Sequence, residues 1–425
     1  PVSVFEFIFL SNFLNEAFES IFLCLFLSVF MPSECSASSS TFPLKSRICS
    51  TILRRFFTPL SLRVLIRNLA VMAATKKIGT HSGKFHCDEA FACYMLKQLP
   101  EFKDHQIVRS RDEKVLSECD IVVDVGGVFD HSTRRYDHHQ KEFQETMSTL
   151  GLLPFNTRLS SAGLIYAHYG KQIIAKYLNV PVDDKLVSLF YHRLYSVYVE
   201  QVDAVDNGIS AYEGLPKYHT SGGISGRVGH LNPHWNEKDV DADERFGKAM
   251  NLVGEDFMEI LRYLYQVWWP AREIVEKAIE SRNDTDSSGR VIVLPSNGGV
   301  PWKEHFFDLE DELGLSSSNI TYIVFGEGND WRVQAIPNSR LSSFDNRQPL
   351  PRTWRGLRDD SLSNESGIEG GVFVHLTGFI GGNRSKEGAI AMAAKAIQLG
   401  SQDPEVTETD VKKMKLEEQS TTVQA

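Results

Sequence analysis

From Lys77 onward, short apolar runs with strand character alternate with longer runs in which apolar residues recur every three or four positions. Such an alternation of strands and helices predicts a mostly parallel sheet with helices on its faces, which is an α/β fold. Polar residues that follow the strands gather at the carboxyl edge of a sheet of this kind, where ligands bind. The expected strands are Lys77–Thr80, Gln106–Ser110 and Ile121–Gly127, and the expected helices are Ala90–Leu99, Leu159–Tyr169 and Lys185–Val205.

The second half of the chain has a different order of elements. A long helix is expected around Phe257–Arg282, and the strand-like runs VIVLP, TYIVFG, WRVQAI and GVFVHL follow it, which predicts an antiparallel or mixed sheet. The stretch GFIGGNRSKEGAIAMAAKAIQ indicates a glycine turn that opens a helix, and backbone amides at a helix start suit an anion. We therefore expect two lobes: an N-terminal domain of residues 75–250 with a parallel sheet, and a smaller C-terminal α/β domain of residues 251–400.

Residues 1–74 differ in composition from the rest and are expected to form a leader. The first thirty residues carry eight phenylalanines and neither lysine nor arginine, and their longest apolar run, Ile21–Leu27, is far shorter than the roughly 20 residues that span a bilayer. We interpret them as translated upstream sequence and expect no stable membrane association. From Met31 the leader is rich in Ser and Arg with Glu34 as its only acid, which is typical of a transit peptide for mitochondria or, with weaker support, plastids. The alternative is an internal start at Met72.

Charge and cysteine content limit the classes of function. The net charge is −10, and the residues after the leader are more acidic still, with 39 basic and 51 acidic side chains. This balance excludes a general polyanion binder, which would need a basic face, so a nucleic-acid substrate requires a local basic groove or a metal ion at the phosphate. The six cysteines include no Cys-x-x-Cys pair, which indicates neither a disulfide framework nor a thiolate zinc site and favours a reducing compartment. The polar segment 401–425 lacks periodicity and is expected to be disordered.

Histidine and aspartate are concentrated where the strands of the N-terminal domain end. Six of the thirteen histidines fall between His81 and His139. Imidazole and carboxylate without thiolate suit manganese, zinc, magnesium or iron, and the share of carboxylate favours manganese or magnesium. Two ions about 4 Å apart would need roughly five to seven ligands when one carboxylate bridges them. The candidate ligands are His81, His86, Asp88, Asp124, Asp137, His138, Asp203 and Asp206.

Each of these residues also has a purely structural interpretation. An aspartate after a strand is more often the cap of a helix than a metal ligand, and Asp206 with Asn207 and Gly208 also suits a helix end and its turn. His138 and His139 are adjacent, so both cannot face one site from a regular strand, and one of them is expected to act behind the other. These alternatives would have to hold at four separate segments at once, which favours a shared metal site.

The segments GTHSGKFHCDEA, VVDVGGVFD, RYDHHQKEF and VDAVDNG, in this order, resemble the melanocyte proliferating gene 1 exonuclease family. This family belongs to the DHH phosphoesterase superfamily, together with RecJ-type exonucleases and manganese-dependent inorganic pyrophosphatases. The resemblance continues through LSSAGLIY, PWKEHF, WRVQA, LPRTWRGLRD and VFVHLTGFIGGN, and it covers about residues 76–398. It identifies Asp137, His138 and His139 with the triplet that gives the superfamily its name.

The resemblance implies roles for the other candidate ligands. His81 and Asp88 correspond to the first superfamily motif. His86 stands where the superfamily has an aspartate, with one more residue between it and His81, so its role stays open. Asp124 corresponds to the second motif and is implied as the carboxylate that bridges both ions. The fourth motif would contribute one of two residues, Asp203 or Asp206.

The activity implied by the resemblance is that of a 3′–5′ exonuclease that degrades RNA. It would use two Mn²⁺ ions, or Mg²⁺, and work in mitochondria, with the nucleus and cytoplasm as further locations. The candidate catalytic side chains are His86, His138 and His139, of which His139 or His86 could donate a proton. The candidate substrate contacts in the C-terminal domain are His375, Gly381, Gly382, Asn383 and Arg384.

Three other functions are weighed against the exonuclease. The first is hydrolysis of a small phosphate compound, such as pyrophosphate or a short oligonucleotide, which substrate length would distinguish. The second is metal-dependent protein hydrolysis, which has little support because the sequence contains neither an HExxH helix nor a nucleophile elbow. The third is a non-enzymatic binding protein, which the near-complete ligand set disfavours.

Overall fold

The computed structural model describes residues 76–215, 221–340, 342 and 345–400. The described elements belong to the compact unit that begins at Lys77. The leader 1–74, with its targeting segment, and the segment 401–425 lie outside the described residues, so the expectations for them stay predictions.

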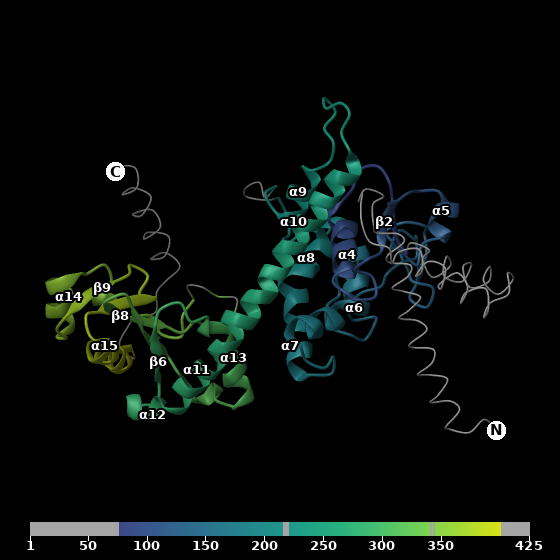
Figure 1. The fold of residues 1–425 in the computed structure, drawn as a ribbon. Coiled ribbons are helices and arrows are strands. Elements are labelled where there is room, and N and C mark those ends of the chain that lie inside the picture. Colours follow the sequence, from purple (N-terminus) through teal and green to yellow (C-terminus); the bar gives the residue numbers. More distant parts are fainter. Residues whose placement is uncertain (1–75, 216–220, 341, 343–344, 401–425) are drawn as a thin grey trace, which may run out of the picture. The chain divides into compact units, whose positions relative to one another are not determined.

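The first sheet, to which the strand labelled β2 in Figure 1 belongs, is almost entirely parallel, as predicted. Strand β1 pairs in parallel with β2 and β3, β3 pairs in parallel with β5, and only the short β4–β5 pair is antiparallel. The strand order is β2-β1-β3-β5-β4. The bounds are β1 Lys77–Thr80, β2 Gln106–Arg109, β3 Ile121–Val123, β4 Phe129–Asp130 and β5 Arg135–Tyr136.

Helices cover both faces of this sheet. Successive side chains of β3 point to opposite faces, so they pack in two different cores. Ile121 and Val123 belong to the main core, into which α4 and α6 also pack, whereas Val122 contacts the smaller cluster around Leu116 of α5. The alternation predicted from the sequence is therefore confirmed. The helical bounds are α4 Cys87–Lys97, α5 Glu113–Ser117, α6 Ser161–Leu178, α7 Lys185–Leu194, a π-helical turn Tyr195–Val199, α8 Glu200–Asp206 and α9 Ile224–Gly229.

A long helical segment connects the two halves of the chain. It consists of α10 (Ala242–Tyr263), a π-helical turn (Leu264–Trp268) and α11 (Trp269–Glu280), followed by the short α12 (Arg282–Thr285). The helix thus begins earlier than the sequence predicted. Pro270 follows the π-helical turn and has no N–H to donate, so the regular pattern of helical hydrogen bonds is interrupted there. Side chains up to Trp268 pack in the first core and those from Val275 onward pack in the second.

The second sheet is mixed, as predicted. Its order is β6-β7-β8-β10-β9, and only the β6–β7 pair is parallel. Val324 and Val333 point to the face covered by α15, while Ile323 and Ile292 point to the face covered by α11 and α13. The bounds are β6 Val291–Asn297, α13 Trp302–Glu312, β7 Tyr322–Glu327, β8 Asp330–Ala335, α14 Asp359–Ser366, β9 Gly371–Val374, β10 Ile380–Asn383 and α15 Lys386–Leu399, with 3₁₀ turns at Ser316–Ser318 and Arg352–Trp354.

The glycine turn predicted before the last helix is wrong. Gly381 and Gly382 lie inside strand β10, paired with β8 on one side and β9 on the other, so the ladder of a central strand occupies this backbone. A Cβ at residue 382 would approach a guanidinium nitrogen of Arg332 to 2.8 Å, which explains the glycine by packing within the sheet. The helix begins after this strand, where the Ser385 hydroxyl accepts from Gly388 N.

The segment between α9 and α10 contains a solvent-exposed tryptophan, Trp235. His234 N donates to the Glu237 carboxylate (2.8 Å), Glu237 N donates to His234 O (3.1 Å), and Arg245 holds the same carboxylate at 2.8 Å. Trp235 sits in this braced turn and is 97% exposed. The Asn232 side-chain amide forms two hydrogen bonds with the backbone of Phe85, because its Oδ1 accepts from Phe85 N and its Nδ2 donates to Phe85 O, each at 2.8 Å. These bonds connect the segment to the loop before α4.

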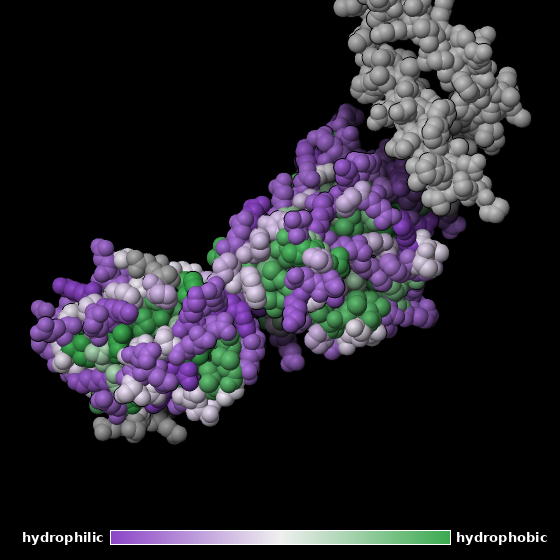
Figure 2. Space-filling view, turned by 60° about the horizontal axis from the view of Figure 1, so that its bottom comes forward, coloured by the Kyte–Doolittle hydropathy of each residue, from purple (hydrophilic) through white to green (hydrophobic). Residues whose placement is uncertain are grey.

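Figure 2 shows a face on which apolar side chains are interspersed among polar ones. Within the described ranges, we find no helix with the length and apolar character that crossing a bilayer demands.

Candidate metal centre

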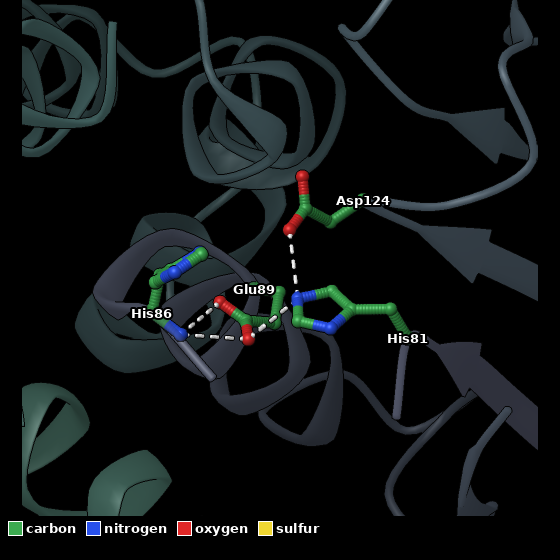
Figure 3. Close-up of side chains that lie close together, drawn as sticks. All are labelled: His81, His86, Glu89 and Asp124. Carbon is green, nitrogen blue, oxygen red and sulfur yellow. Dashed lines mark hydrogen bonds and ion pairs between the residues drawn. The ribbon is translucent and has the colours of Figure 1, made fainter. Parts of the chain in front are cut away.

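His81 is the first residue beyond β1 and is buried at the carboxyl edge of the parallel sheet. Its Nε2 atom lies 3.0 Å from Glu89 Oε1 and 3.3 Å from Asp124 Oδ2 (Figure 3). Its Nδ1 atom lies 3.2 Å from both Ser82 O and the Arg111 guanidinium. The ring is therefore oriented so that Nε2 faces two carboxylates.

The start of α4 supplies the next side chains. His86 is the N-cap residue, and both Glu89 oxygens accept from its backbone N–H, at 2.8 and 3.0 Å. This capping arrangement turns Asp88 and Glu89 into the first helical turn, where both side chains are fully buried. The sequence HCDEA thus places the His86 imidazole and the Glu89 carboxylate near His81, and the Asp88 carboxylate near His86.

Asp124 lies at the centre of the cluster and has an unusual backbone. It follows β3, its N–H donates to Tyr136 O at 3.0 Å, and its φ angle is +58°. This left-handed conformation is rare outside glycine, and aspartate and asparagine are among the side chains that tolerate it. The two carboxylate oxygens consequently face different histidines: Oδ2 lies 3.3 Å from His81 Nε2, and Oδ1 lies 3.3 Å from His138 Nε2.

The expectation that only one of the two adjacent histidines faces the site is wrong. The chain leaves the strand after Tyr136, so strict alternation no longer applies. His138 is buried and His139 is 63% exposed, yet His139 Nδ1 also lies 3.6 Å from Asp124 Oδ1. The Asp137 carboxylate supports the second histidine. It accepts hydrogen bonds from His139 N (3.1 Å) and from Gly127 N, and it lies 2.7 Å from His139 Nδ1.

Asp203 and Asp206, one turn apart on α8, have different environments. The Asp206 carboxylate lies 3.2 Å from His138 Nε2, inside the cluster. Asp203 is fully buried, and its oxygens accept from Ser160 N and Oγ, Gly163 N and Tyr195 OH at 2.7–3.0 Å. The structure therefore places Asp206 among the candidate ligands and Asp203 outside them, as a support of the start of α6.

The charges of the cluster act strongly on one another. Burial alone would lower the pKa of His81, but hydrogen bonds to Asp124 and Glu89 outweigh it and raise the pKa to about 10. Burial and the neighbouring charge of Asp88 raise the pKa of Asp206 to about 8, and burial raises the pKa of Glu89 to about 7. Negative charge is thus crowded at this edge of the sheet, and a divalent cation is the kind of partner that would offset it.

The donor set fits metal ions. Asp88 Oδ1, Asp124 Oδ1 and both ring nitrogens of His138 are buried without a hydrogen-bond partner, which is uncommon for polar atoms unless they serve a ligand. Potential ligand atoms within 4.8 Å of one another form three overlapping groups: His81, His86, Glu89 and Asp124; Asp124, His138 and His139; and His86, Asp88 and Asp206. Asp124 belongs to the first two groups and His86 to the first and third, so the groups form one continuous centre.

The predicted substrate contacts lie in the second sheet and its loops. The His375 ring packs against Phe379, and its Nδ1 lies 2.9 Å from Thr377 Oγ1. The Asn383 amide is buried and bonds Glu369 O and Ser385 N, so it organises the chain around β10. Arg384 is exposed, with Asp359 3.8 Å away. Of these residues, Arg384 presents the most accessible charge to a phosphate.

Sequence reasoning missed two residues of the centre. Glu89 gives no distinct signal in the sequence, because an acid in the first turn of a helix has an ordinary explanation as a cap. Arg111 follows β2 by two residues, at the same sheet edge as His81, and its Nε also donates to Ser82 O. The rule that had pointed to residues after β1 and β3 applies equally to β2, so this signal was available.

Comparisons with known proteins agree with the sequence motifs. The MYG1 exonuclease family model, described as uncharacterised protein family UPF0160, matches residues 77–397. MYG1 protein C27H6.8 of Caenorhabditis elegans is 60% identical over 80% of this chain and 99% of the relative, and the MYG1 exonuclease of Homo sapiens is 46% identical over 80% and 91%. A RecJ structure in complex with Mn²⁺ from Thermus thermophilus is 13% identical, covering 78% of this chain and 53% of that one at a TM-score of 0.21, which is too low to establish a common fold. The chain belongs to the MYG1 exonuclease family.

Proposed function

We propose that this protein is a metal-dependent phosphodiesterase that removes nucleotides from the 3′ end of RNA. The observation that carries the proposal is the geometry of Asp124, whose two oxygens face two different histidines across the centre. A carboxylate in that position suits a bridge between two cations. The names of the relatives, MYG1 exonuclease, support the choice of a nucleic-acid substrate.

We further propose two Mn²⁺ ions as the cofactors, with Mg²⁺ as the alternative, because carboxylate and imidazole ligands suit these metals. One ion would be held on the His81 side of Asp124 and the other on the His138 side, with Asp88 and Asp206. When bound, such ions activate water and offset charge on the phosphate.

The residues of this chain have complementary tasks in the proposed reaction. The Asp137 carboxylate contacts Nδ1 of His139, which orients the ring and raises the pKa of His139. The exposed imidazole can therefore donate a proton to the leaving oxygen. Arg111 brings a guanidinium to the edge of the centre, where it can receive a phosphate oxygen. In the second lobe, Arg384 and His375 remain the candidate contacts to more distant phosphates.

The test is cleavage of labelled single-stranded RNA in Mn²⁺, with matched DNA and pyrophosphate as competing substrates. A 3′–5′ exonuclease shortens 5′-labelled RNA progressively and releases labelled mononucleotide at once from 3′-labelled RNA. The reverse pattern would reject the direction, and faster hydrolysis of pyrophosphate than of RNA would favour the small-phosphate alternative. Cleavage without any divalent ion would reject the proposed chemistry altogether.

For the leader, we propose mitochondrial import directed by residues 31–69. Their basic, Ser-rich and nearly acid-free composition supports this. A fluorescent reporter fused behind this segment should enter mitochondria, and a diffuse cytosolic signal would reject the proposal and favour Met72 as the start.

A further inference from the structure

Glu89 is a buried acid whose negative charge needs an explanation. Its side chain is fully buried, and its oxygens have two kinds of neighbour: the backbone N–H of His86 and the ring nitrogen of His81. The first contact closes the capping box of α4, which glutamine would satisfy as well as glutamate. A buried carboxylate costs far more than a buried amide unless it meets a cation. The cap alone therefore does not explain why the residue is an acid.

The second neighbour of Glu89, the His81 ring, is shared with another carboxylate. Glu89 Oε1 lies 3.0 Å and Asp124 Oδ2 lies 3.3 Å from the same atom, His81 Nε2, and the four groups His81, His86, Glu89 and Asp124 converge within 4.8 Å (Figure 3). A single ring N–H cannot donate fully to two carboxylates. A cation at the point of convergence would contact both oxygens and both imidazoles.

The two sides of the centre differ in their charge. On the far side, Asp88 and Asp206 accompany His138, so that position has two carboxylates of its own besides Asp124. On the near side, His81 and His86 are neutral donors when they bind metal, and both Asp124 and His86 are also within reach of the far position. Glu89 is therefore the only carboxylate of the described cluster that belongs to the near side alone.

We propose that Glu89 is a ligand of the ion on the His81 side and supplies the negative charge that a position with two imidazoles otherwise lacks. The inference rests on the proposed two-ion centre. It also makes the two positions chemically different, because the near one has two nitrogen donors and the far one is dominated by oxygen.

The experiment uses full-length Glu89→Gln, which keeps the cap of α4 but removes the charge. Calorimetric titration with Mn²⁺ should show one ion bound as in the wild type and the other weakened by about tenfold or more. The absorption spectrum of Co²⁺ bound in place of Mn²⁺ should change for one ion, and the melting temperature of the metal-free protein should be unchanged or higher. Glu310→Gln is the matched control, a buried glutamate of the second lobe that should leave Mn²⁺ binding unaltered.

A double variant separates charge from shape. His86→Asp combined with Glu89→Gln moves the carboxylate to the neighbouring position of the same side, and aspartate is also a good helix N-cap. It should recover most of the lost Mn²⁺ affinity. Binding of both ions by Glu89→Gln at wild-type affinity, loss of both ions together with a lowered melting temperature, or failure of the double variant to recover would each overturn the inference. Wild-type protein that binds Mn²⁺ but cleaves no RNA would instead overturn the proposed nuclease and leave this inference standing.

Discussion

Buried carboxylates have different partners in the two lobes. In the second lobe, the Glu310 carboxylate is held by both terminal nitrogens of Arg347, at 2.7 and 2.6 Å. At the edge of the first sheet, Asp88 Oδ1 and Asp124 Oδ1 are buried with no hydrogen-bond partner, and the nearest positive groups are histidines whose charge depends on a proton. The Glu310–Arg347 pair is complete within the chain, whereas the carboxylates at the edge of the first sheet have donor atoms that could bind a cation from solution.

This contrast implies that the lobes respond differently to ions and to mutation. A buried acid paired by arginine contributes to folding whatever the metal concentration. Acids crowded around the metal centre oppose folding until a cation offsets their charge. Function and stability are therefore expected to separate along the chain, and four experiments test this separation.

The largest effect is expected at Asp124. Asp124→Asn keeps the shape and tolerates the left-handed backbone, but it removes the charge between the two candidate ion positions. RNA cleavage in Mn²⁺ should fall by about 1,000-fold or more, or ~4 kcal/mol of transition-state stabilisation, together with loss of bound metal. Circular dichroism should show an intact fold.

Asp130→Asn is the control for that experiment. Asp130 is a half-buried acid of the same segment whose oxygens organise a turn with Ser132 and Thr133. It should retain most activity and all bound metal. Equal losses in both variants would reject the bridging role of Asp124.

The second effect concerns the complete pair of the second lobe. Glu310→Gln leaves the Arg347 guanidinium without its carboxylate, and the free energy of unfolding should fall by about 3 kcal/mol. Urea denaturation followed by circular dichroism measures this change. Mn²⁺ binding should stay at the wild-type level, and a loss of metal would contradict the proposed independence of the two regions.

The third effect is stabilisation by the ion itself. At a free Mn²⁺ concentration one hundred times its dissociation constant, the wild type should gain about 2.7 kcal/mol per site, because the folded state alone presents the assembled ligands. Thermal unfolding with Mn²⁺ and with a chelator measures the gain. Asp124→Asn should show little of it, and an equal shift in both proteins would place the stabilising ion elsewhere.

The smallest effect distinguishes the two aspartates of α8. Asp203→Asn weakens hydrogen bonds to Ser160 and Tyr195, so stability should fall by about 1.5 kcal/mol while bound metal is retained. Asp206→Asn should do the reverse, with one Mn²⁺ lost and little change in the stability of the metal-free protein. Metal analysis and denaturation of both variants decide the assignment, and a loss of metal in Asp203→Asn would overturn it.

The sequence predicted both sheets and the segments of the centre because these depend on local patterns. Apolar periodicity located the strands, and the polar residues after β1 and β3 had to meet at one edge. It could not decide between Asp203 and Asp206, because both lie on one helix and only the packing of α6 shows which carboxylate is used internally.

Two other features depended on context that the sequence does not state. Gly381 and Gly382 suggest a turn by composition, but their pairing with β8 and β9 depends on strands far away in the chain. Strand geometry predicted that one of His138 and His139 acts behind the other, but β5 ends at Tyr136, before both of them. In both cases tertiary contacts outweighed the local rule.

The braced turn at Trp235 has a practical consequence for spectroscopy. An indole almost fully in water emits at longer wavelengths than buried tryptophans and is open to collisional quenching by iodide. Because Asn232 joins this segment to the backbone of Phe85, a rearrangement of the 82–86 loop would be transmitted toward that fluorophore. Trp235 therefore lies in a segment that Asn232 joins to the loop before His86, and we expect its emission to change when a titration of the centre moves that loop.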